Sequence, residues 1–258
     1  MNSTEELKSS IDGAVGWLKI DRPRSRGAMT RDMWQAFPAL LQDLASHEEV
    51  RVIVVTGTEG NFVAGADITE FRALRSDPEE ARRYDEGSRD TLAALEKLSV
   101  PTIAMLGGPC IGGGCLLAFG CDLRIAAQDV PMGIPAGRLG LAYPHHALER
   151  LLALLGEATT LDLLLTGRFV QGEEALRMGM LHRCVSSDQL EETTRKIAAQ
   201  VASNAPLALA YSKQASRRVG RISPDEVKDL VSRCFQSEDY AEGVTAFLEK
   251  RRPQFKGR

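Results

Sequence analysis

The sequence lacks the features that would place it in a membrane or on nucleic acid. Its 258 residues contain no apolar run of the roughly 20 residues needed to cross a bilayer, and the first ten residues contain no apolar signal core. The 32 basic and 35 acidic residues give a net charge of −3, so no basic excess favours nucleic acid or an anionic membrane. We therefore expect a cytoplasmic protein without nucleic-acid or membrane partners.

Phosphate-loop, dinucleotide and paired-cysteine motifs are also missing. No Gly-Lys-Ser/Thr follows a glycine loop, and no Gly-x-Gly-x-x-Gly follows the apolar run that ends at Leu106. The five cysteines include no Cys-x-x-Cys pair and are odd in number, which favours buried free thiols in a reducing compartment. The alternative is a reactive thiol at Cys115, because a helix N-terminus lowers thiol pKa. We predict no metal site.

The sequence does contain an alternation of strand and helix patterns. Apolar residues make up 43% of the chain, which is enough for a sizeable core. Short apolar runs predict buried strands, and apolar residues three or four apart predict helices. The expected strands are 14–20, 52–55, 102–106 and 123–126, and the expected helices are 33–44 with Thr30 as N-cap, 78–98 and 116–119. This order predicts an α/β fold with parallel strands.

From about residue 145 the pattern becomes mainly helical. A strand-like run at 182–185 interrupts it, and helices are expected over 190–201, 206–218, 224–235 and 239–251. No linker is long enough to separate independent domains. We expect an α/β core over residues 1–200 and a C-terminal helical region over residues 201–258. The last helices pack either on the core or on a neighbouring subunit.

Two glycine-containing loops follow predicted buried strands. One is the turn Gly112–Gly114, which precedes an apolar helix, and the other covers residues 60–68. Glycines leave the N–H groups at a helix start uncovered, and such groups bind developing negative charge. Two strand-end loops side by side can aim two amides at one oxygen, which makes an oxyanion hole. The alternative is a pair of tight turns without a ligand.

Taken together, these motifs resemble the enoyl-CoA hydratase/isomerase (crotonase) family over nearly the whole chain. The matching segments occur in the family's order and are Asp21-Arg22-Pro23, Gly27-Ala28-Met29, Val54-Val55-Thr56-Gly57, residues 62–68, Pro101-Thr102-Ile103-Ala104, Gly112-Gly113-Gly114, residues 121–126, Leu139-Gly140-Leu141, residues 164–167, residues 175–181 and the tail 247–255.

The resemblance implies a crotonase-like spiral of repeated ββα units, with C-terminal helices that build homotrimers or dimers of trimers. It implies an acyl-CoA ligand and no covalently bound cofactor. The thioester oxygen would accept hydrogen bonds from the amides of Ala66 and Gly113. The family-like positions for coenzyme A are Arg22, Arg24, Ala64, Ala66, Asp67, Ile68, Phe247 and Lys250. Surface placement is the alternative for the cations, and loop structure is the alternative for Asp67.

Two positions depart from the hydratases of this family. A glutamate is expected after the Gly-Gly-Gly-Cys turn and another after the proline of the next segment, and these positions hold Leu116 and Ala136. Neither residue can activate water or deliver a proton, so standard glutamate-pair hydration is not expected. His145 and His146 are the candidate replacements, because histidine moves protons near neutral pH. The alternative is that both only pack or cap a helix, and Tyr143 is a weaker candidate.

Two functional hypotheses of different classes follow. The first is an enzyme that stabilises a thioester enolate for hydration, isomerisation or a related reaction. The second is a non-catalytic acyl-CoA carrier or sensor, and Leu116 with Ala136 favours it, whereas the two histidines favour chemistry. A serine peptidase on a related fold is a third reading, but the glycine turn contains Cys115 and no serine.

Overall fold

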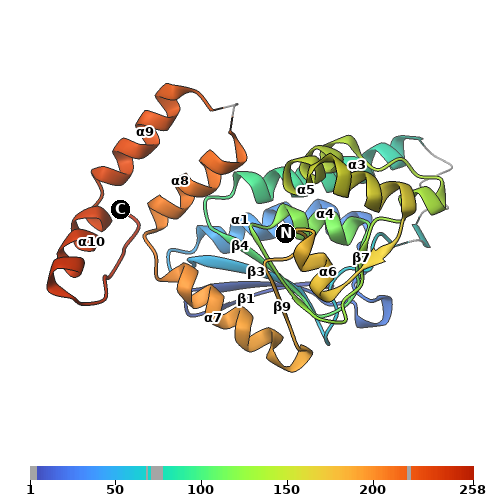
Figure 1. Ribbon diagram of the computed structural model, residues 1–258, viewed down its shortest axis with the longest axis horizontal. Helices are drawn as coiled ribbons and strands as arrows, with labels where there is room; N and C mark the ends of the chain where they lie inside the picture. The colour runs from blue at the N-terminus through green and yellow to red at the C-terminus, as the bar shows by residue number, and fades with distance from the viewer. Residues whose placement is uncertain (1–4, 68, 71–77, 220–221) are drawn as a thin grey trace.

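A six-stranded sheet forms the centre of the chain in the computed structural model, which describes residues 5–67, 69–70, 78–219 and 222–258 (Figure 1). Its strand order is β1-β2-β3-β4-β6-β9. The first two strands are antiparallel, and every later pair is parallel. The strands are β1 (Leu7–Asp12), β2 (Val15–Ile20), β3 (Val52–Gly57), β4 (Thr102–Leu106), β6 (Leu123–Ala127) and β9 (Arg183–Val185).

A second, three-stranded sheet consists of very short strands. It comprises β5 (Cys110–Ile111), β7 (Met132–Gly133) and β8 (Phe169–Val170). Strand β7 lies parallel to β5 and antiparallel to β8. Strand β5 follows β4 and leads into the glycine turn, so this small sheet fixes where the turn begins.

Helices cover both faces of the large sheet. Figure 1 shows α1 (Arg31–Ser46), α3 (Pro78–Lys97), α4 (Gly113–Gly120) and α5 (His145–Thr166) on one face and α7 (Leu190–Ala202) on the other, with the short α6 (Gly172–Arg177) near β9. Helix α1 forms as expected, because the Thr30 side chain accepts a hydrogen bond from the Met33 amide. Its apolar residues Met33, Phe37, Leu41 and Leu44 share one face and are buried.

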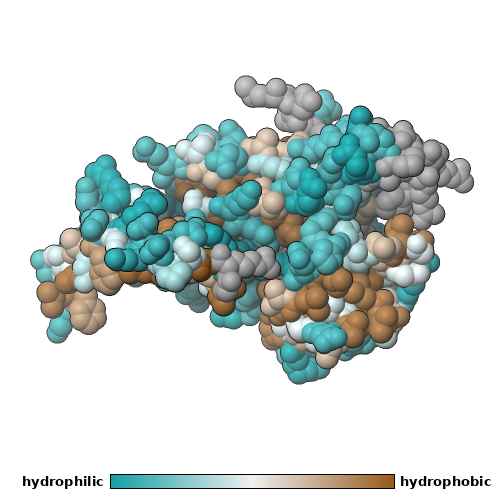
Figure 2. Space-filling view, turned by 90° about the horizontal axis from the view of Figure 1, so that it is seen from above, coloured by the Kyte–Doolittle hydropathy of each residue, from teal (hydrophilic) through white to brown (hydrophobic). Residues whose placement is uncertain are grey.

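The last helices extend away from the layered core. Figure 1 shows α9 (Pro224–Phe235) and α10 (Glu238–Glu249) at one end of the molecule, joined to the core through α8 (Pro206–Arg217). Hydrophobic side chains are exposed on this arm, as Figure 2 shows at its left side, and they include Phe235, Tyr240, Val244, Phe247 and Leu248. None of the helices that the structure describes has the length and apolar character needed to span a bilayer.

All five cysteines are free thiols. Cys110, Cys115 and Cys121 are buried, and Cys184 and Cys234 are partly exposed. The expectation of buried free thiols is therefore confirmed for the three cysteines of the apolar segment.

Candidate functional site

The glycine turn connects β5 to α4. Gly112 is the N-cap of α4 with φ +54° and ψ −106°, a backbone conformation that residues with a Cβ rarely adopt. Its amide donates to the Gly133 carbonyl at 2.9 Å, which ties the turn to β7. Helix α4 begins at Gly113. The first amides of a helix have no intrahelical acceptor, so the turn presents N–H groups at its start.

The segment before helix α1 orients the Ala66 amide. Met29 and Ala66 form a parallel bridge in which the Met29 amide donates to the Gly65 carbonyl and the Met29 carbonyl accepts from the Asp67 amide, both at 2.9 Å. Successive backbone groups of an extended segment point to opposite sides. The Ala66 N–H therefore points away from Met29.

The glycine turn packs directly against this second loop. A Cβ at Gly114 would lie 2.0 Å from the Val63 carbonyl oxygen, so only glycine permits the approach. A Cβ at Gly113 would lie 4.0 Å from the Ala66 amide nitrogen and 3.2 Å from the Trp34 indole ring. The amides of Gly113 and Ala66 are thus close neighbours. Among the described residues neither amide donates a hydrogen bond, so both can donate to one oxygen of a ligand.

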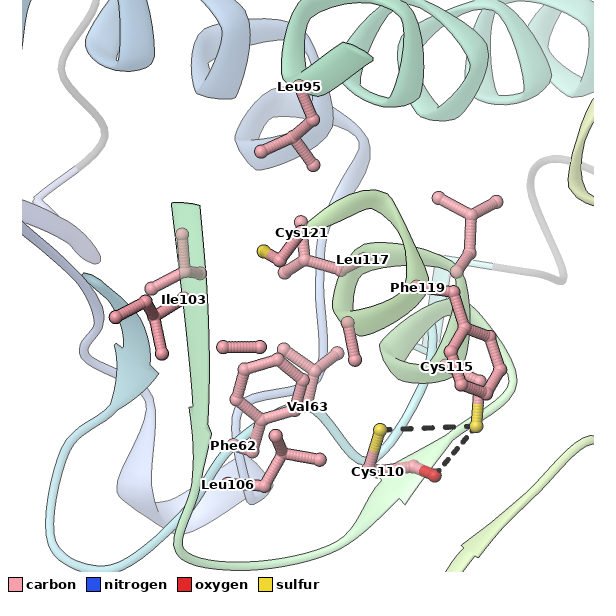
Figure 3. Close-up of a cluster of buried hydrophobic side chains, with 14 of the residues drawn as sticks. Phe62, Val63, Leu95, Ile103, Leu106, Cys110, Cys115, Leu117, Phe119 and Cys121 are labelled. Atoms are coloured by element: carbon pink, nitrogen blue, oxygen red, sulfur yellow. Dashed lines mark hydrogen bonds between the residues drawn. The ribbon is translucent and has the colours of Figure 1, made fainter. Parts of the chain in front are cut away.

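A buried apolar cluster supports the turn from below. Figure 3 shows Cys110 and Cys115 joined by dashed lines, with Phe62, Val63 and Leu106 to one side and Phe119 beside Cys115. The Cys115 thiol donates to the Cys110 carbonyl at 3.0 Å and lies 3.9 Å from the Cys110 sulfur. Cys115 is fully buried and faces β5. Its contacts are those of a packing residue, which favours the structural interpretation over a reactive thiol.

Arg22 joins the loops that carry the site. Its Nη1 donates to the Ala28 carbonyl at 2.6 Å and to the Asp67 carboxylate at 2.9 Å, and its Nε lies 2.9 Å from the Glu6 carboxylate. The Arg22 side chain is only 15% exposed. The family resemblance makes Arg22 a candidate for coenzyme A phosphates, and these contacts engage its Nη1 and Nε within the loops. Arg22 therefore acts on the loop that contains Ala66, whereas Arg24 is exposed.

Asp67 has the loop-structuring contacts of an Asx turn. Its Oδ1 accepts from the Thr69 amide at 3.0 Å and from the Thr69 hydroxyl at 2.7 Å. Burial opposes ionisation, but the hydrogen bonds from Thr69 and Arg22 outweigh it and hold the pKa of Asp67 below its ordinary value. The neighbouring Ala64 donates its amide to the Arg26 carbonyl at 3.0 Å. Ile68 lies outside the described residues.

The two histidines lie at the start of α5 without a described contact to the glycine turn. His145 is 83% exposed and pairs with Glu149, with 3.6 Å between His145 Nε2 and a Glu149 carboxylate oxygen. His146 Nε2 lies 3.4 Å from the Ser88 hydroxyl on α3, and burial lowers the pKa of His146. The structure therefore directs His145 to solvent and His146 to α3, which favours the alternative that both only pack or cap the helix.

Leu116 and Ala136 stand at the two positions where the resemblance expects glutamates. Leu116 is buried on α4, and Ala136 begins a short 3-10 helix, Ala136–Leu139. Neither side chain titrates. Tyr143 was the weaker candidate in the sequence. Of Tyr143, His145 and His146, it is the residue with a described contact to the turn, because its hydroxyl lies 3.5 Å from the Gly112 carbonyl oxygen.

The structure of one chain does not bring the last helix to this site. Phe247 is 83% exposed on α10, and Lys250 is the C-cap of that helix with φ +55°. Figure 1 shows α10 at the far end of the arm.

Trp34 packs against Gly113 and was not predicted as a site residue. An apolar residue on a predicted helix gives no sign of whether it lines a binding site or packs in the core.

Comparison with known proteins agrees with this architecture. The sequence model of the enoyl-CoA hydratase/isomerase family matches residues 10–258. This chain belongs to that family. A short-chain-enoyl-CoA hydratase from Clostridium acetobutylicum is 33% identical, over 96% of each chain. A crotonyl-CoA hydratase from Syntrophomonas wolfei is 32% identical, over 92% of this chain and 93% of the relative.

Solved structures of the enoyl-CoA hydratase/isomerase family share the whole fold. An enoyl-CoA hydratase/carnithine racemase from Magnetospirillum magneticum superposes with a TM-score of 0.94 at 30% identity, covering 99% of this chain and 97% of the other. The expected crotonase fold is therefore confirmed. The two curated relatives are named as hydratases. Within the family, this member carries leucine and alanine at the positions where the resemblance places the hydratase glutamates.

Proposed function

We propose that this chain binds an acyl-CoA thioester and stabilises negative charge on the thioester oxygen with the amides of Ala66 and Gly113. The observation that carries the proposal is the close approach of two loops, in which the Ala66 and Gly113 amides have no acceptor within the described residues. Enolate formation next to a thioester places negative charge on that oxygen. Removal of one pre-oriented donor of this kind raises the reaction barrier by about 3–4 kcal/mol in other enzymes. The positive N-terminal end of the α4 dipole also stabilises negative charge on this oxygen.

The reaction class that fits this site is proton transfer beside the thioester, as in isomerisation. Hydration through two carboxylates has no support, because Leu116 and Ala136 occupy the two positions. Of the two histidines, His145 is directed to solvent and His146 is the less exposed, so this proposal keeps His146 as the candidate base although its described contact is to Ser88 on α3. Burial lowers the pKa of His146, so its imidazole is neutral at pH 7 and able to accept a proton.

Coenzyme A recognition requires cations for its phosphates. In this proposal, Arg24 and Arg26 come from the same chain, and Lys250 with the apolar Phe247 comes from a neighbouring copy. Arg24 and Arg26 are exposed beside the loop that carries Ala64. Phe247 belongs to α10 and Lys250 is its C-cap, and Figure 1 shows α10 at the far end of the arm, away from the core of the same chain. A homotrimer or a dimer of trimers would cover the exposed apolar side chains of the arm and supply both residues. Light scattering that finds a monomer at micromolar concentration would remove this part of the proposal.

A non-catalytic acyl-CoA carrier or sensor is the second candidate. The specific observation in its favour is that the positions of both hydratase glutamates are apolar. A carrier keeps the donors for the thioester oxygen and needs no base. The two candidates therefore share the binding site and differ only in proton transfer.

The decisive experiment measures binding and proton transfer separately. Calorimetry compares an acyl-CoA thioester with the thioether of the same chain length, which lacks the carbonyl oxygen. We expect the thioester to bind at least about tenfold more tightly, because two amide hydrogen bonds are lost in the thioether. Equal affinities would refute the assignment of Ala66 and Gly113. Exchange of the α-proton in deuterated water then identifies an enzyme, and tight binding without exchange identifies a carrier.

A further inference from the structure

The Tyr143 hydroxyl contacts the peptide group that supplies one of the two amides. Its oxygen lies 3.5 Å from the Gly112 carbonyl oxygen, and this carbonyl belongs to the same peptide unit as the Gly113 N–H. A trans peptide is planar, and its C=O and N–H bonds point in opposite directions. Tyr143 therefore lies on the far side of this peptide from the position of a ligand oxygen bound to the Gly113 amide.

The Gly112 carbonyl has a second donor. The Leu116 amide donates to it at 3.1 Å as the first intrahelical bond of α4. A carbonyl oxygen has two lone pairs and can accept both bonds. Two donors on one carbonyl limit rotation of the peptide plane, which sets the direction of the Gly113 N–H. Hydrogen bonds to a carbonyl also polarise the peptide and strengthen its N–H as a donor.

The environment of Tyr143 makes its hydroxyl a neutral donor. Within the described part of the chain, the Gly112 carbonyl is the hydrogen-bond partner of this hydroxyl. Burial raises the pKa of Tyr143 well above its ordinary value, and the nearby thiols of Cys115 and Cys110 act in the same direction. The phenol is thus protonated at neutral pH and unsuited to act as a base. A distance of 3.5 Å marks a weak bond, which has room to shorten when a bound oxygen acquires charge.

We infer that Tyr143 is a positioning residue, which orients and polarises the Gly112–Gly113 peptide so that the Gly113 N–H donates more strongly to the developing oxyanion. The inference rests on the proposed function. It also assigns the loop after Ala136 a role that needs neither glutamate nor histidine. Tyr143 strengthens the electrostatic part of the site and takes no proton from the substrate.

The test compares wild type with Tyr143→Phe, which keeps the ring and removes the hydroxyl. Tyr211→Phe, at a half-buried tyrosine on α8, is the matched control. The probe is butyryl-CoA labelled with ¹³C at the carbonyl, and isotope-edited infrared spectroscopy reports how far binding lowers the carbonyl stretching frequency. We expect Tyr143→Phe to show a smaller shift than wild type and Tyr211→Phe. Its α-proton exchange rate should fall roughly 3- to 10-fold at nearly unchanged affinity, as expected for one neutral hydrogen bond.

A second variant distinguishes an effect of the hydroxyl from an effect on folding. Incorporation of 3-fluorotyrosine at position 143 retains the hydroxyl and makes it a stronger donor, so the carbonyl shift should exceed that of wild type. Equal shifts in wild type, Tyr143→Phe and the fluorinated protein would overturn the inference. Loss of exchange in Tyr143→Phe with an unchanged carbonyl shift would also overturn it, since the hydroxyl would then act on the proton directly. No shift in wild type would instead refute the proposed function.

Discussion

Replacement of Gly114 by alanine should separate the two loops that form the candidate site. The added Cβ would lie 2.0 Å from the Val63 carbonyl oxygen and 3.0 Å from its carbonyl carbon. The obstacle is backbone, so no side-chain rotation relieves it. The Val63 carbonyl also accepts a hydrogen bond from the Ile111 amide at 3.0 Å, which holds it in place. Helix α4 and the loop must therefore move apart by about 1.4 Å to restore ordinary contact at 3.4 Å.

Steric strain should outweigh the helix propensity of alanine at this position. Overpacking of a close contact costs about 1–3 kcal/mol, whereas glycine to alanine within a helix gains about 0.5–1 kcal/mol. We expect a net loss of about 1–2 kcal/mol, which lowers the midpoint of thermal unfolding by about 2–4 °C per kcal/mol in a chain of this size. Displacement of a catalytic group by about 1 Å can cost 100-fold in rate. Activity should thus fall much more than stability.

The assay combines thermal unfolding with the infrared shift of a bound acyl-CoA carbonyl. Gly243→Ala is the matched control, because Gly243 is also helical and its added Cβ would lie 3.5 Å from the Phe255 ring, an ordinary contact. This control should keep or slightly raise the unfolding midpoint. A Gly114→Ala protein with the unfolding midpoint and carbonyl shift of wild type would refute the close approach of the two loops.

Three further predictions concern the charged groups around the site and the sheet. Asp67→Asn should lower the unfolding free energy by about 1–2 kcal/mol in urea and reduce the carbonyl shift, because Arg22 and Asp67 are only 15% and 13% exposed. Burial and Arg124 lower the pKa of His182 to about 4 in the folded chain. Between pH 6.5 and 4 only the unfolded chain binds this proton, so the free energy of unfolding should fall as the pH drops through this range. His182→Gln should remove this loss, which we put at up to about 2 kcal/mol for a partly exposed group, as measured by urea titration across that range. His145→Ala should change neither α-proton exchange nor unfolding, and a loss of exchange would reinstate His145 as a base.

Features that depend on local sequence were predictable. The Thr30 cap, the apolar stripe of α1 and the β-branched run of β3 each arise from neighbours within a few residues, and each forms where expected. The glycine turn was also evident, because a helix that starts after three glycines exposes amides whatever the rest of the fold does. The family motifs then placed Ala66 opposite Gly113, and the structure brings these two residues together.

Features that depend on remote contacts were not predictable. Strands of two residues such as β5 have no periodicity, and β1 buries only Leu7, so neither gives an alternating pattern. Arg22 was a candidate for phosphate binding by resemblance, and a loop arginine gives no sign in the sequence of a carboxylate partner 45 residues away. Whether a side chain points to solvent or to a site depends on such contacts, as His145 and Tyr143 show.

The charges around α4 show why part of the site cannot be predicted from neighbouring residues in the sequence. Three arginines from separate elements donate to the last carbonyls of this helix: Arg150 to Phe119 at 2.8 Å, Arg217 to Gly120 at 2.7 Å and Arg124 to Cys121 at 3.0 Å. Burial lowers the pKa of Arg124 and Arg150 to about 10, so both remain charged at pH 7. Cations at the C-terminal end neutralise the negative pole of the helix dipole. The negative pole then reduces the positive potential at Gly113 by less, because the helix has only eight residues and is about 12 Å long. The Gly113 amide, which the proposed function assigns to the thioester oxygen, therefore gains field strength from the far end of its own helix. None of these arginines is adjacent to the glycine turn in sequence.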